Sequence, residues 1–373
     1  MKKLLIVTTI SETLTSFLLP FAHHFKDRGW RVDAMSQGVS QSPECLAAFD
    51  QVWEIKWSRN PLDPRNLIIA PSVIQQVVKQ EEYDLVHVHT PVAAFVTRYA
   101  LRNFRKSGKL RVIYTAHGFH FYPGGNPFKN QIFLTLEKIA GNWTDDLVVI
   151  NRTDESAAKH YQIIAPNSLH YMPGIGVDLQ YYSQDSISSE AVDRVYQELA
   201  ITSENPLFLV IAEFIPRKHH QDVLQALAKL GRSHVHLALA GDGSLLPQMQ
   251  SLAVELGIKN QVHFLGYRQD IPTLIKAATA TILVSEQEGL PRSIMESLAI
   301  GTPVIGSDIR GIKDLLKEGC GILVKVGDVE DLTKAIARII DRPSETKAMS
   351  EKGINCISKY DLQQIIHLHE KLY

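Results

Sequence analysis

Short, continuous runs of apolar residues alternate along the chain with stretches in which apolar residues recur at helical spacing. The apolar runs are rich in Val, Ile and Leu, which is typical of parallel strands buried on both faces. They lie at Leu4–Thr9, Arg31–Ser36, Asp84–His89, Arg111–Ala116 and Asp146–Asn151, and then at Leu207–Ala212, Val235–Ala240, Val262–Gly266, Thr281–Ser285, Pro303–Gly306 and Ile322–Val326. Amphipathic stretches between them, such as Asp222–Leu230 and Leu245–Leu256, predict an α/β fold built from repeated strand–helix–strand units.

This pattern restarts near the middle of the chain. Met172–Val177 contains Pro and two Gly, the polar stretch Ser183–Glu204 predicts a helix, and a new buried strand begins at Leu207. We place the domain boundary between residues 173 and 205 and divide the chain into 1–180, 181–355 and a final helical segment, 356–373, in which Asp361 is a suitable N-cap. Two Rossmann-like domains follow, with ligands expected outside the carboxyl ends of their strands.

Composition and charge remove several classes of protein. The 373 residues carry 39 basic and 40 acidic side chains, so the formal net charge is −1 and no nucleic acid is expected as a partner. Three cysteines, Cys45, Cys320 and Cys356, have no CxxC spacing, which argues against disulfides and structural zinc and favours the cytoplasm. No apolar run reaches the roughly 20 residues of a membrane span, and we interpret the apolar start of the chain as a strand rather than a secretory signal.

Several familiar motifs are missing from the sequence. GxGxxG does not follow the first strand, which argues against a dehydrogenase, and GxxxxGK[ST] and GxSxG are also absent. No DxD pair occurs, which makes metal-dependent sugar transfer a poor hypothesis.

The most informative stretch is Val284–Gly301, which carries two glutamates around a strand-to-helix turn. Glu288 follows a strand, Pro291 suits the first turn of a helix, and Glu296 falls inside that helix. Free amides at a helix start bind phosphate or sugar oxygens, and a carboxylate accepts hydrogen bonds from vicinal hydroxyls. From the spacing alone, a capped helix with two solvated glutamates is an equally good interpretation.

The run Glu288-Gly-Leu-Pro-Arg-Ser-Ile-Met-Glu296 resembles the E-x7-E element of retaining glycosyltransferases of family 4. Further matches follow in family order at Ala240–Gly243, Val262–Gly266, Gly301–Asp308 and Gly321–Val324. The resemblance implies the GT-B fold, in which two Rossmann-like domains face each other across a cleft and the final helix crosses back to the first domain. It also implies a retaining, metal-independent transferase without a cofactor, in which the second domain binds a nucleotide-sugar.

The resemblance implies a role for each matched residue of the second half. Glu296 would bind the ribose, Glu288 the donor sugar, and the backbone at Gly289, Leu290 and Pro291 would face the sugar and diphosphate. The remaining donor contacts are expected at the turn of Gly241 and Gly243 and at the loop of Tyr267 and Arg268, which would border the base.

Cations for the diphosphate are expected after the first strand of the second half. Lys218 matches the lysine of the family pattern G-R-L-x-x-x-K-G, and Arg217 adds a second positive charge. Ala212, Glu213 and His219 depart from the Gly, Arg and Gly of that pattern. Which side chain holds the α-phosphate stays open at this point.

Histidines mark the candidate site of the first half. His117 matches a strand-end histidine that lies beside the donor sugar in the family, although an ordinary loop histidine is the alternative. His120 is a weaker candidate. His87 and His89 alternate along a strand and so share a face, where they line the cleft or, less plausibly, hold zinc.

The acceptor is expected to be a glycan or a polyprenyl-linked glycan of surface polysaccharide biosynthesis, and the donor a UDP-hexose or UDP-N-acetylhexosamine. Arg98–Arg111 holds six basic residues and no acid, and Pro127–Trp143 is largely apolar. Together they suggest a peripheral contact with an anionic membrane surface on the inner face of the cell membrane, unless they are a solvated face and a core helix. A nucleotide-sugar epimerase and a non-catalytic nucleotide-sugar binding protein of the same fold are the rival hypotheses.

Overall fold

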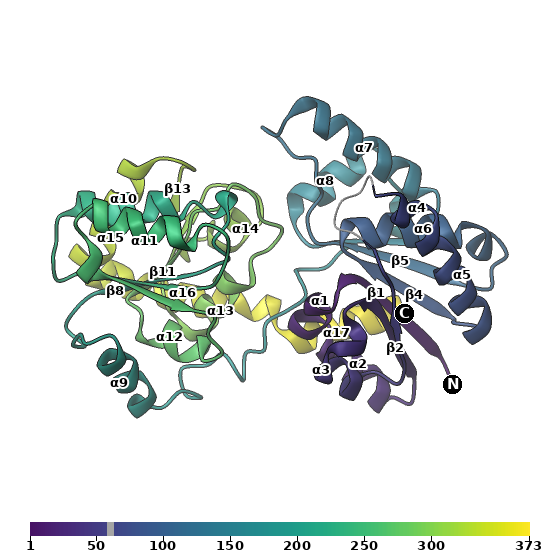
Figure 1. Ribbon diagram of the computed structural model, residues 1–373, viewed down its shortest axis with the longest axis horizontal. Helices are drawn as coiled ribbons and strands as arrows, with labels where there is room; N and C mark the ends of the chain where they lie inside the picture. The colour runs from purple at the N-terminus through teal and green to yellow at the C-terminus, as the bar shows by residue number, and fades with distance from the viewer. Residues whose placement is uncertain (58–62) are drawn as a thin grey trace. The chain divides into compact units, whose positions relative to one another are not determined.

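The computed structural model describes residues 1–57 and 63–373, which form two compact units (Figure 1). Unit 1 comprises Met1–Ile175 together with Ile365–Tyr373, and unit 2 comprises Gly176–Gln364. Each unit is a parallel sheet with helices on both faces, so the expected α/β class is confirmed. The division between Ile175 and Gly176 lies within the segment that the sequence pattern marks by its Pro and Gly residues.

Over its described residues, unit 1 contains a seven-stranded sheet of order β3-β2-β1-β4-β5-β6-β7. The strands are β1 (Lys3–Ile10), β2 (Arg31–Gln37), β3 (Val52–Glu54), β4 (Leu85–His89), β5 (Arg111–Ala116), β6 (Asp146–Val149) and β7 (Leu169–Tyr171). The helices are α1 (Ser11–Phe17), α2 (Leu19–Asp27), α3 (Pro43–Ala48), α4 (Pro64–Leu67), α5 (Ile69–Glu81), α6 (Pro91–Lys106), α7 (Pro127–Gly141), α8 (Arg152–His160) and α17 (Leu362–Leu372).

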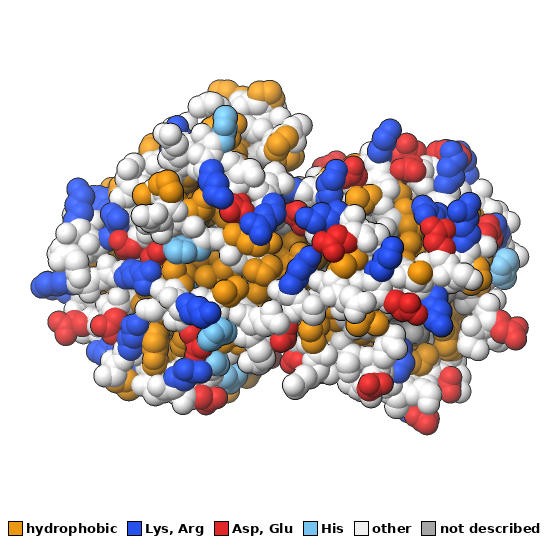
Figure 2. Space-filling model, turned by 180° about the vertical axis from the view of Figure 1, so that it is seen from behind, with side chains coloured by type: hydrophobic (Ala, Val, Ile, Leu, Met, Phe, Trp, Pro, Cys, Tyr) orange, Lys and Arg blue, Asp and Glu red, His pale blue; other side chains and the backbone are white. Residues whose placement is uncertain are grey.

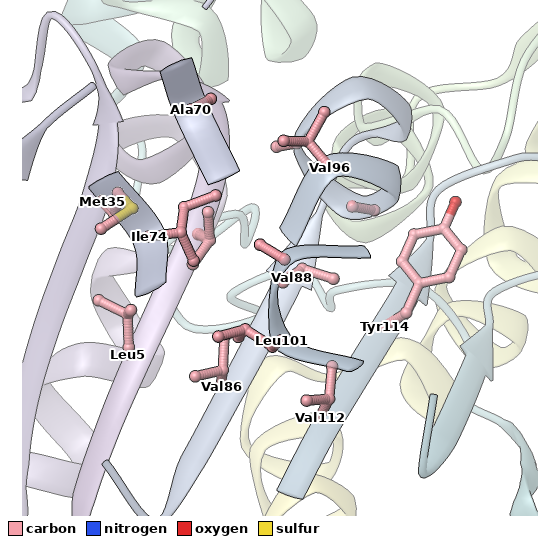
Figure 3. Packing of buried hydrophobic residues seen from close by; sticks show 14 of the residues in the cluster. Leu5, Met35, Ala70, Ile74, Val86, Val88, Val96, Leu101, Val112 and Tyr114 are labelled. Carbon is pink, nitrogen blue, oxygen red and sulfur yellow. The ribbon is translucent and has the colours of Figure 1, made fainter. Parts of the chain in front are cut away.

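The core of unit 1 explains why its strands read as continuous apolar runs. Side chains of β1, β4 and β5 such as Leu5, Val86 and Val112 are fully buried and lie against residues of α5 and α6 such as Ile74 and Leu101 (Figure 3). The edge strands β3 and β7 were not predicted, because each has only three residues and none of them is fully buried. Burial on both faces is what makes a strand readable from its sequence.

The final helix, α17, packs on unit 1 through its last residues. The ring centroids of Phe21 and His369 are 4.9 Å apart, and those of Phe25 and Tyr373 are 4.8 Å apart. Arg111 at the start of β5 donates a hydrogen bond to the carbonyl of Leu372 at 2.5 Å. These contacts place Ile365–Tyr373 in unit 1, although they follow unit 2 in sequence.

Unit 2 contains a six-stranded parallel sheet of order β10-β9-β8-β11-β12-β13. Its strands are β8 (Leu207–Ile211), β9 (His236–Ala240), β10 (Val262–Gly266), β11 (Ala280–Leu283), β12 (Val304–Ser307) and β13 (Gly321–Val324). Its helices are α9 (Ser189–Glu198), α10 (His220–Leu230), α11 (Leu246–Glu255), α12 (Ile271–Ala277), α13 (Arg292–Ile300), α14 (Ile312–Leu316), α15 (Val329–Asp341) and α16 (Pro343–Ile357). Separate buried clusters form the cores of this unit, and residues from its strands contribute to both.

Candidate active site

The loops after β10, β9, β8 and β11 emerge next to one another at one edge of the unit 2 sheet, because these parallel strands are neighbours in that order. The chain runs from β8 outward to β10 and then returns to add β11 on the other side of β8. Ligands of open α/β sheets bind at such a switch point, outside the carboxyl ends of the strands. Lys218 follows β8 and Glu288 follows β11, so the fold brings both to this point.

Two cations and a carboxylate meet at the switch point. Lys218 Nζ lies 2.5 Å from Glu288 Oε1, and Arg217 Nη1 lies 3.7 Å from the same oxygen. Arg217 also donates to the backbone carbonyl of Gln287 at 2.9 Å. The side chains of Lys218 and Glu288 are largely buried, whereas that of Arg217 is 45% exposed. This arrangement offers positive charge for a phosphate and a carboxylate for a hydroxyl.

Glu296 lies in the second turn of α13 and is 6% exposed. Pro291 precedes the helix in an extended conformation rather than forming its first turn, as the spacing had suggested. Arg292 Nε lies 2.7 Å from Glu296 Oε1, and Tyr182 hydrogen-bonds the carboxylate. Burial raises the pKa of Glu296, and its two partners only partly offset that rise. A carboxylate has roughly four acceptor sites, so sites remain for vicinal hydroxyls.

A cavity of about 560 Å³ opens among the loops after β8, β9 and β10. It brings together four residues that the sequence predicted for the donor, Gly241, Gly243, Tyr267 and Arg268. Tyr267 is 76% exposed, so its ring is available to a planar ligand. A Cβ added at Gly241 would lie 2.1 Å from the carbonyl oxygen of Ala212, so only glycine permits this approach of the two loops.

Arg268, which the resemblance placed in the loop beside the base, is paired with two carboxylates at this cavity. The Arg268 guanidinium is 2.5 Å from Glu198 and 2.7 Å from Asp270, so its charge is already balanced. Glu213 also lines the cavity. The cations at the switch point are therefore Arg217 and Lys218, and Glu213 places negative charge where the family pattern has arginine.

His117 lies in unit 1, just after β5, and contacts His89, one of two neighbouring buried histidines of β4. Its Nε2 is 3.0 Å from His89 Nδ1, and the rings of His87 and His89 are 4.2 Å apart. His87 Nε2 also contacts the hydroxyl of Thr115 at 2.7 Å. Burial lowers the pKa of His117 to about 4, so the ring is neutral near pH 7. His120 is exposed and its ring lies beside Phe133 instead.

No metal site is evident in the part of the chain that the structure describes. Within residues 1–57 and 63–373, no group of three or more His, Cys, Asp or Glu side chains is arranged to hold a metal ion. The rings of His87 and His89 are tilted by 36° to each other, and the two histidines hydrogen-bond to Thr115 and His117 respectively.

The basic segment Arg98–Arg111 is not the continuous positive surface that its sequence suggested. Arg98 is 1% exposed and its guanidinium lies 3.0 Å from Glu137 of α7. Arg105 pairs with Asp145, and Arg111 pairs with Asp146. The acids that neutralise these arginines come from residues 137–146, so local sequence could not reveal them.

By contrast, α7 exposes Phe128, Ile132 and Ile139, and hydrophobic side chains reach the surface in this part of unit 1 (Figure 2). The apolar segment is thus not simply a core helix. Over the described residues, no helix is both long enough and apolar enough to cross a membrane.

Several residues around the site were not predicted from the sequence. The spacing of Arg292 and Glu296, four apart on a helix, is a signal that was available. Tyr182 lies just before the polar stretch Ser183–Glu204, within the expected boundary region, and nothing in its local pattern marks it. Asp222 binds His219 from three residues away, which is also a local spacing, whereas Glu286 binds it from the loop after β11, which only the folded chain reveals.

Comparison with known proteins matches both halves of the chain. A family model described as Glycosyltransferase Family 4 matches residues 15–181, and one described as Glycosyl transferases group 1 matches residues 193–355. EpsD of Bacillus subtilis, itself assigned as a glycosyltransferase by inference, is 31% identical over 356 residues, which cover 94% of this chain and 91% of that protein.

More distant relatives include another glycosyltransferase and a solved structure of the same fold. UDP-Gal:alpha-D-GlcNAc-diphosphoundecaprenol alpha-1,3-galactosyltransferase of Escherichia coli is 25% identical over 77% of this chain and 73% of that protein. HepE of Anabaena, crystallised with UDP and glucose, superimposes with a TM-score of 0.82 at 19% identity, covering 100% of this chain and 99% of that one. Two Rossmann-like units of this kind define the GT-B class. The chain belongs to the glycosyltransferases of family 4, as its E-x7-E run suggested.

Proposed function

We propose that this glycosyltransferase moves a hexose or N-acetylhexosamine from a UDP-sugar to a hydroxyl of a glycan or polyprenyl-linked acceptor in surface polysaccharide biosynthesis, with retention and without a metal. The observation that carries the proposal is the cluster of Lys218, Arg217 and Glu288 at the switch point of unit 2. Glu296 on the helix that follows, and the cavity beside Tyr267, complete a donor-shaped set of contacts.

Each part of this set suits one part of a nucleotide-sugar. The Glu296 carboxylate accepts hydrogen bonds from the two ribose hydroxyls, and Tyr267 offers its ring to the base. Lys218 and Arg217 bind the diphosphate, and Glu288 turns from Lys218 to a hydroxyl of the donor sugar. The backbone of Gly289, Leu290 and Pro291 lies between Glu288 and Glu296 along the chain, and in this arrangement it faces the sugar and diphosphate; Pro291 itself has no N–H to donate.

In the proposed step, an acceptor hydroxyl attacks the anomeric carbon as the bond to the diphosphate oxygen breaks. The electron pair leaves with UDP, and the hydroxyl proton passes to the departing phosphate oxygen on the same face, which retains the configuration. Negative charge grows on the diphosphate during this step, and Lys218 and Arg217 are placed to stabilise it. In this proposal, these two side-chain cations stabilise the charge of the diphosphate, as a metal ion does in other transferases. Neutral His117 contributes a hydrogen bond to the donor sugar.

The names of relatives support the donor and acceptor classes. The Escherichia coli relative uses UDP-galactose and an acceptor on undecaprenyl diphosphate, according to its name. HepE shares the fold and binds UDP.

We also propose that α7 contacts an anionic membrane surface on the cytoplasmic side, where polyprenyl-linked acceptors are held. Its outer residues combine exposed Phe128, Ile132 and Ile139 with exposed Lys129 and Lys138. Apolar anchors with interspersed lysines are typical of helices that lie in the membrane interface. Binding to phosphatidylglycerol vesicles that is weakened in Phe128→Ser and by high salt supports this contact, whereas equal binding by the variant argues against it.

A thermal-shift panel with UDP, GDP, ADP and NAD, each with and without chelator, tests the donor class. A ligand at 100 times its Kd stabilises the folded state by about 2.7 kcal/mol. We expect stabilisation by UDP that chelator leaves unchanged. A response to GDP or ADP alone would remove the UDP assignment, and a response to NAD alone would remove the transferase donor site.

The anomeric configuration of the product, read by NMR after transfer from the best UDP-sugar, tests retention. Donor turnover into an epimer without any acceptor would instead identify a nucleotide-sugar epimerase.

A further inference from the structure

Each residue of the turn 217–219 hydrogen-bonds a residue of the loop 285–288. The backbone carbonyl of Arg217 accepts hydrogen bonds from the Glu286 amide at 2.9 Å and from the Ser285 hydroxyl at 3.0 Å. Lys218 binds Glu288, and His219 binds Glu286. The loop that carries Glu288 is therefore held by the turn that carries Lys218.

His219 occupies a strained position in this contact. Its backbone has φ of +52°, a left-handed conformation that costs most residues roughly 1–2 kcal/mol, and the family pattern has glycine here. Non-glycine residues in such conformations are often kept for what their side chains do.

The side chain of His219 bridges two carboxylates. Nδ1 lies 2.8 Å from Asp222 Oδ2 on α10, and Nε2 lies 2.9 Å from Glu286 Oε1 in the loop after β11. Ionised carboxylates only accept hydrogen bonds, so both ring nitrogens must donate, and only the imidazolium does so. The neutral ring keeps one of the two bonds and turns a lone pair toward the other carboxylate.

The other charged and titratable groups around the His219 ring do not oppose its positive charge. Lys218 and Arg217 precede it, but Glu288 takes both of them as partners. His220 follows on α10, and burial lowers its pKa to about 4, so it adds no positive charge near pH 7. Although burial of the His219 ring opposes its charge, the hydrogen bonds to Glu286 and Asp222 raise the pKa of His219 above its usual value.

We propose that His219, as a doubly donating imidazolium, is a positioning residue that holds the Glu286–Glu288 loop against the Arg217–Lys218 turn, so that UDP-sugars bind more tightly with the ring charged than with it neutral. The inference deepens the proposed function, since it takes Lys218 and Glu288 as donor contacts. Because the folded state favours the cation, the clamp is complete below the ordinary pKa of histidine and is lost as the pH rises through the raised value.

Calorimetric titration with UDP-glucose and UDP-N-acetylglucosamine between pH 6 and 8.5 tests the proposal. In the wild type, Kd should rise roughly twofold to fivefold over this range, the worth of one partly exposed ion pair. His219→Asn and His219→Gly tolerate the left-handed backbone and so should fold. Their Kd should match the weak alkaline value of the wild type at every pH. Glu286→Gln should move the transition to lower pH.

His234→Asn, an exposed histidine of the same unit, is the matched control and should keep the wild-type profile. A wild-type pH dependence that persists in His219→Asn would overturn the proposal. An NMR titration of the His219 ring tests its charge independently of the donor. A measured pKa at or below 6.5 would overturn the assignment of an imidazolium near neutral pH, whichever donor the protein uses. If the wild type binds neither UDP-sugar while the ring titrates above 6.5, the UDP assignment fails and the contact between the two segments stands.

Discussion

At the scale of single residues, the two glutamates of the E-x7-E run differ because their surroundings differ. Glu288 lies against Lys218 and Arg217, which keep its carboxylate paired until a ligand competes. Glu296 is buried on α13 beside Arg292 and Tyr182, and burial raises its pKa. Under the proposed function, Glu288 therefore exchanges its cation for the donor sugar, whereas Glu296 is preorganised for a ligand that brings hydroxyls.

Glu296→Ala should weaken UDP binding by about tenfold or more, because hydrogen bonds to a charged group contribute roughly 1.5–3 kcal/mol. In the wild type, affinity should be full above the raised pKa of Glu296 and fall as the pH drops through it, at a higher pH than for an ordinary glutamate. Calorimetric titration with UDP measures both.

His117→Ala, in the other unit, should bind UDP normally and lose transfer. Equal UDP affinity in wild type and Glu296→Ala would remove the ribose assignment.

Lys218→Met keeps most of the aliphatic stem and removes the cation that binds Glu288. We expect kcat for transfer to fall by roughly a hundredfold, the usual scale for losing one group that stabilises charge in the transition state. Steady-state kinetics with a UDP-sugar measures this. Lys229→Met, an exposed lysine paired with Glu330, is the control and should behave as the wild type. A kcat for Lys218→Met within twofold of the wild type would exclude the diphosphate role.

At the scale of elements, the proposed donor site is a row of loops at the carboxyl ends of β10, β9, β8 and β11. None of these loops forms the site alone, because the cavity needs three of them and the ion pair needs the fourth. Their spacing depends on close backbone contacts, of which Gly241 against Ala212 is the tightest near the cavity.

Gly241→Ala should therefore destabilise unit 2 and weaken UDP binding, since the new Cβ would lie 2.1 Å from the Ala212 carbonyl oxygen and the loops would have to separate. Gly257→Ala is the matched control, because its φ is also positive but nothing lies within 4 Å of the new Cβ. The control should lose only about 1–2 kcal/mol from the backbone conformation. Thermal unfolding with and without UDP compares them, and equal losses would contradict the role of the close contact.

At the scale of the whole molecule, each unit has buried clusters of its own. The last helix is the exception to sequence order, because α17 follows unit 2 and yet its residues from Ile365 onward pack into unit 1. Ile365 is fully buried, and His369 and Tyr373 lie against α2. The stability of unit 1 should thus depend on the far end of the chain.

Ile365→Ala should cost about 2–5 kcal/mol, as for other large-to-small changes in a core. Hydrogen exchange should become faster in α2 and its neighbours in unit 1, while UDP should still protect the loops of unit 2. Gln363→Ala, on the exposed face of the same helix, is the control. Faster exchange confined to unit 2 would show that the helix belongs there instead.

The sequence alone determined the strands other than β3 and β7, the division into two Rossmann-like units and the residues of the E-x7-E run. All of these are local, because a strand buried on both faces or a helix with one apolar side is written in consecutive residues. The short edge strands β3 and β7, and the true extent of α9 within Ser183–Glu204, lacked such a signal.

Only the tertiary structure decided which residues meet. Lys218 and Glu288 are 70 positions apart, and they pair because β11 is inserted beside β8. The same holds for Tyr182 on Glu296, for the acids that neutralise Arg98 and Arg105, and for Glu286 on His219. Side chains far apart in sequence come together through the order of strands and the packing of helices, and no local pattern records that order.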